Sequence, residues 1–339
     1  MVVTLKDVAQ EANVSPATVS YALRGGQYVS KDTMAKVQKA VKKLGYTTNQ
    51  AARNLRNGRT GVLEVGVHEL DIPYFYSRMA EAMVQQIERS GYKALVVQTG
   101  ANVRTVREAV SRLADQPCDG LITNAGGMSS AELKRLGMGK HVVLIDDFSE
   151  KLVLDTVLAS GEEGLFQSTR HLIEQGCANI AYVGGSYMPM GELDISNSGD
   201  LRKRGYASAL AEAGLEYKPE NMYDAIWTVE PGREAACQII KDGMPYDGIV
   251  CATDSLALGL IRGFADKGIR VPDAVKVSAF DGISVGQYMV PTLTTVSVDI
   301  EDMAVKAVDM LISRVEGRYN GAPRREFANL ELVVRESSR

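Results

Sequence analysis

The fold is decided near the start of the chain by the stretch Thr4-Leu-Lys-Asp-Val-Ala-Gln-Glu-Ala-Asn-Val-Ser-Pro-Ala-Thr-Val-Ser-Tyr-Ala-Leu23. Thr4 is suited to cap a helix, and Asp7, three residues later, can complete a capping box. Ser15 predicts a second helix start, because the proline that follows it has no N–H to leave unpaired in the first helical turn. Asn13 lies between the two apolar patterns and suits a turn. The stretch therefore predicts two short helices joined by a tight turn.

A third predicted helix completes this unit, with Ser30 as its cap and Gly45 as its stop. Three helices in this order are typical of a helix-turn-helix unit, whose second helix presents its first residues to base edges in the major groove. Such a three-helix unit can also serve as a protein docking module, which stays open as an alternative. The residues expected to contact DNA here are Thr4, Ser15, Pro16, Ala17, Thr18, Ser20, Tyr21, Tyr28 and Ser30.

Charge is distributed unevenly along the chain. Residues 1–60 hold ten Lys and Arg against three acidic residues, an excess of +7, whereas the whole chain carries −4 and the remainder therefore −11. A basic head on an acidic body indicates that only the head meets a polyanion such as DNA. A merely solvated basic surface would give the same pattern.

The segment from Asn49 to Asn57 is a helix candidate of barely two turns. Isolated helices shorter than about 12–15 residues are marginal in water, so this one is expected to order only with a partner. Leu55 stands alone among Arg and Asn residues. It can act as an apolar wedge in a minor groove, or it can be an ordinary linker residue.

These motifs together resemble the headpiece of the LacI/GalR family of bacterial transcription regulators. The match covers Val3–Ser20, Leu44-Gly-Tyr46 and the Asn49–Asn57 segment. The resemblance implies that the second helix reads an operator half-site, and that the Asn49–Asn57 helix pairs with its dimer mate in the minor groove. The sequence departs from the family at Thr48, often proline there, and at Tyr21, often arginine, which leaves the operator sequence open. The resemblance adds three expected DNA contacts, Asn49, Ala52 and Leu55, the last inserted at a central base step.

From Val62 onward, strands and helices are expected to alternate. Short apolar runs read as buried parallel strands, and the amphipathic stretches between them read as helices. This alternation predicts a doubly wound α/β fold, and some 270 residues favour two Rossmann-like lobes over one sheet. The predicted strands include Val62–Val67, Ala94–Val97, Gly120–Ile122, Val142–Ile145, Ile180–Val183, Gly248–Cys251 and Val275–Phe280. The predicted helices include Phe75–Ser90, Glu162–Gln175, Arg202–Ala213, Pro231–Lys241 and Ser255–Lys267.

The body also resembles the family's effector domain, which is shaped like a periplasmic sugar-binding protein. The motifs Arg202-x-x-Gly205-Tyr206, Asp254-x-x-Ala257-x-Gly259 and Phe280-Asp281 carry this resemblance. It implies three crossings of the chain between lobes, which we place near residues 160, 292 and 320. The expected division is a headpiece at 1–47, a hinge helix and linker at 48–60, and an effector-binding and dimerisation domain at 61–339. Within that domain, lobe 1 spans about 61–160 and 293–320, and lobe 2 about 161–292 and 321–339.

Polar side chains follow several predicted strands, which is where ligands of such sheets bind. Carboxylates and arginine can hold vicinal hydroxyls, and an indole can pack on the apolar face of a sugar, so a carbohydrate effector is expected. The resemblance implies that Arg202 holds the ligand and that Asp281 contacts it. Asp147 stands where many members have arginine and Ser160 where many have aspartate, so a nucleobase or a phosphoprotein corepressor stays open. The expected effector-binding residues are Asp71, Phe75, Asp147, Arg202, Trp227, Thr253 and Asp281.

Metal sites, cofactors and enzymatic chemistry are not expected. The four cysteines form no CxxC pair and the three histidines lie at no ligand spacing from them. GxSxG, Walker and HExxH motifs are missing from the sequence. No run reaches the ~18 apolar residues of a membrane span, and charge begins too early for a signal peptide. A cytoplasmic protein is the expectation.

The sequence therefore predicts a homodimeric, DNA-binding repressor whose operator affinity is set by an effector bound between two lobes. A solute-binding receptor would share the lobes, but the basic headpiece and the early charge count against it. An NAD- or phosphate-using enzyme would need a glycine fingerprint that the sequence lacks. Val333–Arg339 offers no leucine heptad, which disfavours a tetramerising tail.

Overall fold

The computed structural model describes residues 3–23, 29–46, 59–68, 70, 75–100, 103–112 and 118–339 of the 339-residue chain. The chain divides into two compact units, Met1–Gly61 and Val62–Arg339. Among the described residues, no helix is long and apolar enough to cross a membrane.

The first unit contains the three predicted helices, α1 (Leu5–Ala12), α2 (Pro16–Leu23) and α3 (Lys31–Leu44). The capping box is confirmed, because the Thr4 N–H donates to Asp7 Oδ2 at 2.7 Å and the Asp7 N–H donates to Thr4 Oγ1 at 3.4 Å. The caps of the next two helices are confirmed as well, with Ser15 Oγ accepting from the Thr18 N–H and Ser30 Oγ from the Thr33 N–H. The three helices enclose a small core of Val8, Ala9, Ala12, Val19, Ala22, Val37 and Ala40.

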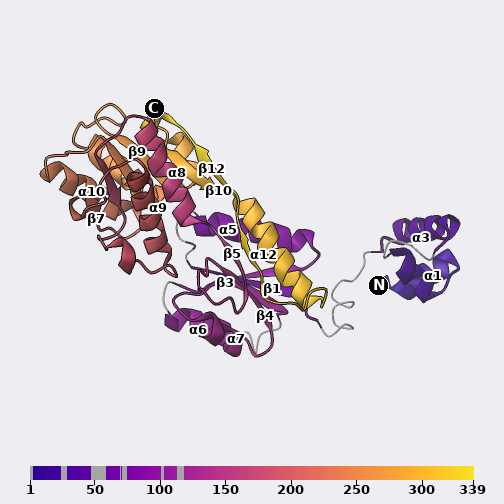
Figure 1. The fold of residues 1–339 in the computed structure, drawn as a ribbon. Helices are drawn as coiled ribbons and strands as arrows, with labels where there is room; N and C mark the ends of the chain where they lie inside the picture. Colours follow the sequence, from indigo (N-terminus) through magenta and orange to yellow (C-terminus); the bar gives the residue numbers. More distant parts are fainter. Residues whose placement is uncertain are drawn as a thin grey trace. The chain divides into compact units, whose positions relative to one another are not determined.

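The second unit contains two six-stranded sheets (Figure 1). The first has the order β11-β5-β4-β3-β1-β2, and all of its pairings are parallel. The second has the order β12-β10-β9-β8-β6-β7, in which only the β10–β12 pairing is antiparallel. The first sheet comprises β1 (Val62–Val67), β2 (Lys93–Gln98), β3 (Gly120–Asn124), β4 (His141–Ile145), β5 (Asp155–Leu158) and β11 (Arg325–Phe327). The second comprises β6 (Ile180–Val183), β7 (Met222–Tyr223), β8 (Gly248–Cys251), β9 (Lys276–Asp281), β10 (Thr294–Val298) and β12 (Leu330–Val333).

Helices cover both faces of the first sheet, which makes it doubly wound. Val143 and Ile145 pack into the main core on the side of α5 (Phe75–Arg89) and α12 (Ile300–Val315). Val142 and Leu144, which point to the opposite face, pack into a second cluster with α6 (Val103–Arg112) and α7 (Ser130–Leu136). In the second lobe, α8 packs against α9 and α10 against α11 (Figure 1). These four helices span Gly161–Glu174, Ser198–Glu212, Val229–Lys241 and Asp254–Ala265.

Glycine permits the close approach of these helix pairs. A Cβ atom at Gly205 of α9 would lie 2.1 Å from the Glu162 carbonyl oxygen of α8. A Cβ atom at Gly259 of α11 would lie 1.8 Å from the Val229 carbonyl oxygen of α10. Both contacts are with backbone, which cannot yield as the end of a side chain can. Any larger residue would therefore force the helices apart, and Gly205 and Gly259 are fixed by packing.

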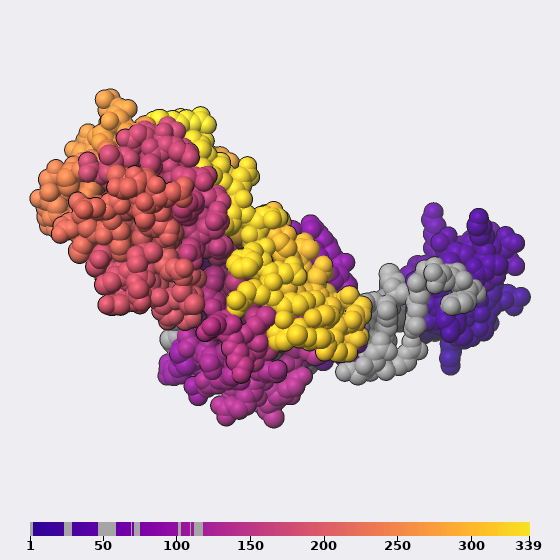
Figure 2. Space-filling model, viewed as in Figure 1, coloured from indigo at the N-terminus to yellow at the C-terminus, as the bar shows by residue number. Residues whose placement is uncertain are grey.

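The strand memberships correct two of the three expected crossings between lobes. The first crossing lies between β5 and α8, near the predicted residue 160. The second follows β10, because Thr294–Val298 pairs with β9 in the second sheet, so residue 292 was placed too early. The third lies between β11, in the first sheet, and β12, in the second, and therefore follows residue 320. Figure 2 shows this late part of the chain, in yellow, lying over both lobes.

The expectation that Ala94–Val97 is a buried strand is wrong in part. The strand β2 forms there, but Leu95 and Val96 are 39% and 37% exposed. The reason is its position, since within the described part of the chain β2 is the last strand at one edge of the first sheet and pairs only with β1. An apolar run does not distinguish an edge strand from a central one.

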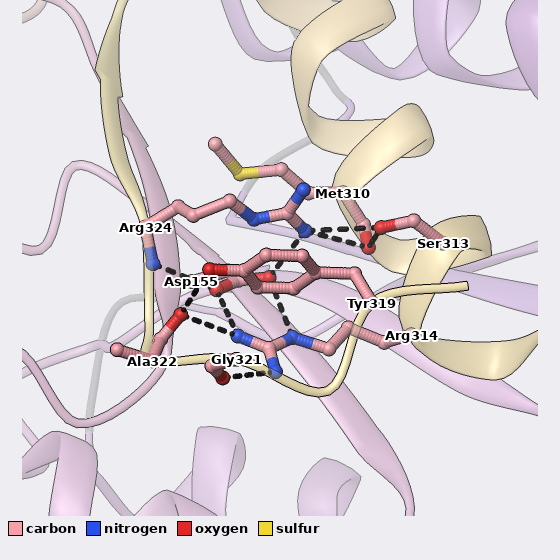
Figure 3. A network of polar contacts seen from close by, with 8 residues as sticks. All are labelled: Asp155, Met310, Ser313, Arg314, Tyr319, Gly321, Ala322 and Arg324. Carbon is pink, nitrogen blue, oxygen red and sulfur yellow. Dashed lines mark hydrogen bonds and ion pairs between the residues drawn. The ribbon is translucent and has the colours of Figure 1, made fainter. Parts of the chain in front are cut away.

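A network of hydrogen bonds and ion pairs in the first lobe joins β5, α12 and the segment before β11 (Figure 3). Asp155 is 3% exposed and receives Arg314 Nη2 at 2.8 Å on one oxygen and Arg324 Nη2 at 2.7 Å on the other. The ring of Tyr319 lies within 4.5 Å of both guanidinium carbons. Burial works to raise the pKa of Asp155, but hydrogen bonds from Arg314 and Arg324 outweigh it and lower that pKa. The ionised form of Asp155 is thus stabilised by folding.

Candidate functional site

The outer face of α2 is the first candidate site. Val19 and Ala22 point into the core of the headpiece, which leaves Ala17 and Tyr21 exposed on the opposite side, and Pro16 is exposed at the start of the helix. Tyr21 is 55% exposed. An exposed aromatic ring with a hydroxyl can both stack and donate a hydrogen bond, so this face presents groups that a base edge can accept.

Other predicted DNA contacts also serve as helix caps. Ser15 Oγ and Thr18 Oγ1 lie 2.8 Å apart, and Thr4 Oγ1 donates to Asp7 Oδ2 at 2.7 Å. Ser30 caps α3, and Ser20 is half-buried. A capping hydroxyl keeps further hydrogen-bonding capacity at an exposed helix start, where an anion is favoured. Tyr28, Asn49, Ala52 and Leu55 lie outside the described residues, as does Asp71 of the predicted effector site.

The second candidate site is built around Arg202, near the start of α9. Its guanidinium lies between two aromatic rings, 4.4 Å from the ring centroid of Trp227 and 4.5 Å from that of Phe280. It donates to the Ala252 carbonyl and, at 3.3 Å, to Asp281 Oδ1. Three of the predicted effector-binding residues, Arg202, Trp227 and Asp281, are thus brought together from α9, the segment before α10 and the end of β9.

The position of Asp281 depends on a left-handed turn. Its φ is 128° and that of Gly282 is 78°, a region that side chains other than glycine rarely adopt. A Cβ atom at Gly282 would lie 2.1 Å from Ser297 Oγ, so glycine is required there for space as well. Asp254, which is fully buried at the start of α11, accepts hydrogen bonds from the Gly282 and Ile283 N–H groups at 2.9 and 2.8 Å. This buried carboxylate therefore holds the turn that presents Asp281.

Three carboxylates lie in this region: Asp254 and Asp281 are buried, Asp146 is half-buried, and the guanidinium of Arg202 acts on Asp146 and Asp281. Burial raises the pKa of Asp146, at the end of β4, to about 6, although the Ala159 N–H and Arg202 oppose the shift. Burial also raises the pKa of Asp281, against the opposing effect of Arg202, and it raises the pKa of Asp254, where the charge of Asp281 adds to the effect. The excess of carboxylates over cations makes this region electronegative when all of them are ionised.

Trp227 is held in place by its indole nitrogen. Nε1 donates to the Gly184 carbonyl at 2.8 Å, directly after β6. The ring is half-buried, and one side of it contacts Arg202. Because its donor is already engaged, the ring can offer a ligand only its aromatic surface.

Three other predicted effector residues make local contacts instead. Thr253 caps α11, accepting from the Leu256 N–H at 3.3 Å. Asp147 accepts from the Ser149 N–H at 3.2 Å, while its Oδ2 has no hydrogen-bond partner. Phe75 opens α5 and meets the Tyr76 ring edge-on at 5.6 Å. On the side of the first lobe, Asp146 lies close enough to Arg202 for the guanidinium to lower its pKa against the effect of burial.

Comparison with known proteins finds a matching family model in each of the two units. Residues 4–49 match the family model for bacterial regulatory proteins of the lacI family, and residues 169–338 match that for a periplasmic binding protein-like domain. The chain belongs to the LacI family. It is a DNA-binding transcriptional repressor with an effector-binding domain, and the relatives it resembles are transcription regulators rather than enzymes.

Individual LacI-family relatives match over nearly the full length. The HTH-type transcriptional regulator RegA of Clostridium saccharobutylicum is 29% identical, with all of both chains covered. The HTH-type transcriptional repressor PurR of Photobacterium profundum is also 29% identical, with 98% of each chain covered. Among solved structures, the transcriptional regulator CelR–cellobiose complex is 26% identical, with a TM-score of 0.72 and 99% of each chain covered. The headpiece and the two α/β lobes predicted from the sequence are thus the LacI-family fold.

The effector-binding set expected from the sequence leaves out four residues of this cluster. Phe280 covers one side of the Arg202 guanidinium, and Ala252 accepts a hydrogen bond from it. Asp254 and Asp146 supply the additional carboxylates. Asp254 does follow a predicted strand, and that position is the one signal that could have marked it as part of the site.

Proposed function

We propose that this LacI-family repressor binds a small-molecule effector at the cluster of Arg202, Asp281 and Trp227, between the two lobes, and that the bound effector changes its affinity for an operator. The observation that carries the proposal is the convergence of a guanidinium, a carboxylate and an indole at the carboxyl ends of β8 and β9. A carbohydrate suits this set, because its vicinal hydroxyls can pair with Arg202 and Asp281 and its C–H face can pack on an aromatic ring.

The proposal also says how a bound effector would act on the backbone that joins the two lobes. Arg202 packs against Gly161, since a Cβ atom there would lie 2.8 Å from Arg202 Cγ, and Gly161 directly follows the first crossing. Asp146 accepts from the Ala159 N–H at 2.7 Å on the other side of the same crossing. An effector that displaces Arg202 or Asp146 would therefore act on the backbone that joins the lobes. Such differential contact is what allows a ligand to shift a conformational equilibrium.

On the DNA side, we propose that the exposed residues of α2, Ala17 and Tyr21 first, read the major groove of an operator half-site. Two copies of the chain would then bind a palindromic operator as a homodimer, inside the cytoplasm. The support is the exposure of this face together with the excess of +7 charges in residues 1–60.

A nucleobase is the second candidate effector. It is favoured by the PurR relatives, which are named as transcriptional repressors and match 26–29% of the aligned residues over most of the chain. A planar purine can stack on an indole and pair with a carboxylate through its N–H groups, so the same three side chains would serve.

The test is a thermal-shift screen of the full chain across sugars, sugar phosphates and purines, followed by gel shifts on an operator. A ligand at ~100 times its dissociation constant should stabilise the protein by about 2.7 kcal/mol. Arg202→Ala should abolish that shift and the operator response while leaving ligand-free operator binding intact. The matched control is Arg270→Ala, an exposed arginine of the same lobe that pairs with Asp273. A fully responsive Arg202→Ala protein would remove Arg202 from the site.

A further inference from the structure

The carboxyl ends of the strands carry almost exclusively acidic charge. Asp146 and Asp147 follow β4, Asp254 follows β8, and Asp281 ends β9. Among the described residues at these strand ends, Arg202 supplies the guanidinium that acts on Asp146 and Asp281. Lys203 lies nearby on α9, but it is only 7% exposed and pairs with Asp200 at 2.7 Å. Its positive charge is therefore already neutralised.

The same strand ends hold polar atoms that are buried and lack a partner. Asn124, whose Oδ1 is an acceptor, is the last residue of β3, and Asp147, whose Oδ2 is an acceptor, follows β4. On the second lobe, the Nε of Arg202 is an unpartnered donor. A buried polar atom without a partner costs about 1–3 kcal/mol, so each has a physical reason to be met by a ligand. The strands β3 and β4 are neighbours in the first sheet, so their two acceptors lie at the same edge.

Two requirements on the ligand follow from these atoms. Because the unpartnered acceptors outnumber the unpartnered donors, the ligand is expected to donate hydrogen bonds, as hydroxyl and N–H groups do. The surplus of carboxylates around one guanidinium excludes a ligand that brings its own negative charge, because like charges close together in a water-poor site repel strongly. A phosphate group needs several cationic or N–H donors, and Arg202 already donates to Ala252 and Asp281.

We infer that the effector is an uncharged small molecule rich in hydroxyl or N–H donors, and that the site rejects the phosphorylated or carboxylated forms of the same molecule. The inference rests on the proposed function and narrows it to one charge class. The raised pKa of Asp146 agrees with it, because burial already disfavours negative charge on the groups that are present.

The first experiment compares matched probes by thermal shift and by operator release. Glucose is compared with glucose 6-phosphate and with glucuronic acid, and guanosine is compared with guanosine monophosphate. The uncharged member of a responsive pair should bind at least about 100-fold more tightly than its anionic counterpart. An anionic probe that binds as tightly as its uncharged partner, or more tightly, would overturn the inference and leave the proposed function in place.

The second experiment needs no ligand. Trp227 is the single tryptophan of the chain, so its emission reports on this region alone. Near surplus carboxylates, the ratio of caesium quenching to iodide quenching should be higher for Trp227 than for free N-acetyltryptophanamide at equal ionic strength, with acrylamide as the uncharged reference. Asp281→Asn should raise the iodide quenching, whereas Asp273→Asn, which removes an exposed carboxylate elsewhere in the lobe, should not.

The two experiments distinguish the inference about charge from the proposed function. If none of the probes shifts the melting temperature but the caesium-to-iodide quenching ratio of Trp227 exceeds that of free N-acetyltryptophanamide, the charge inference stands and the proposed function is weakened. If that ratio is equal to or lower than that of free N-acetyltryptophanamide, the region is not electronegative and the inference fails, whatever the probes do.

Discussion

The Asp254 carboxylate lies behind the turn at Asp281 and also reaches the strand that leads into the second crossing. Its Oδ2 accepts from the two N–H groups that follow Asp281, and its Oδ1 accepts from Thr295 Oγ1 of β10 at 2.6 Å. One buried side chain therefore fixes the geometry of the site and ties it to the backbone between the lobes.

Replacing Asp254 with alanine should destabilise the second unit by about 3 kcal/mol, because two N–H groups and a hydroxyl would be left buried without an acceptor. Asp254→Asn should cost less, since its amide oxygen can accept from both N–H groups while its NH2 donates to Thr295. Thr295→Val removes only the contact to β10 and should cost about 1 kcal/mol. Urea unfolding, followed by circular dichroism, measures all three; equal stability of the alanine variant and the wild type would contradict this role.

Asp146 should make stability fall as the pH rises through the window from about 4 to about 6. Its pKa lies above the ordinary 3.8, so the folded state binds more protons than the unfolded state within that window. Asp146→Asn cannot ionise, and it should reduce the fall in unfolding free energy between pH 4 and 7 by about 2 kcal/mol. The exposed Asp273→Asn serves as the control. An identical pH profile for Asp146→Asn and the wild type would show that Asp146 is not buried in solution.

Asp155 should have the opposite pH dependence. Its pKa is lowered in the folded state, so its contribution is present above the ordinary pKa of 3.8 and is lost as the pH falls below it. Arg314→Ala leaves part of this buried carboxylate unpaired and should destabilise the protein by about 3–5 kcal/mol at pH 7. Arg318→Ala, whose partner Glu316 is on the surface, should change stability by less than about 1 kcal/mol. If the two arginine variants unfold at the same denaturant concentration, the predicted stabilising role of the Arg314–Asp155 pair is wrong.

Tyr21→Ala should weaken binding to the cognate operator by about 10-fold or more, because a base-edge contact is worth about 1–3 kcal/mol. Binding to unrelated DNA should change little, since it depends on phosphate contacts that the lysines of the headpiece make. Gel shifts at several salt concentrations measure both effects, and the salt dependence should stay the same. A uniform loss on both DNAs would indicate that Tyr21 contacts the backbone rather than a base.

The sequence predicted the parts of the molecule that depend on local chemistry. Thr4 with Asp7, Ser15 and Ser30 mark helix starts through hydrogen bonds within one turn, so a short window of sequence contains the information. The sequence also proposed Arg202 and Asp281 as site residues, because each lies at the start of a helix or the end of a strand and matches a family motif, and the structure brings the two side chains together.

The features that the sequence did not predict depend on contacts between segments that are far apart in the chain. Asp146 lies close enough to Arg202 for the guanidinium to oppose the rise of its pKa, and no local pattern distinguishes Asp146 from its neighbour Asp147 in this respect. The second crossing was misplaced because Thr294–Val298 pairs with β9 and β12, which no local pattern reveals. Asp254 was missed because its partners lie 28 to 41 residues further along the chain.

The placement of the last two strands has a consequence for synthesis on the ribosome. β11 forms one edge of the first sheet and β12 one edge of the second, and only a few residues separate them. Neither sheet can be completed until the final strands have left the exit tunnel, although β1 to β5 are made long before. A nascent chain would hold two unfinished sheet edges at once, and open edges are templates for pairing with other chains. The two lobes must therefore close together, at the end of translation, rather than one after the other.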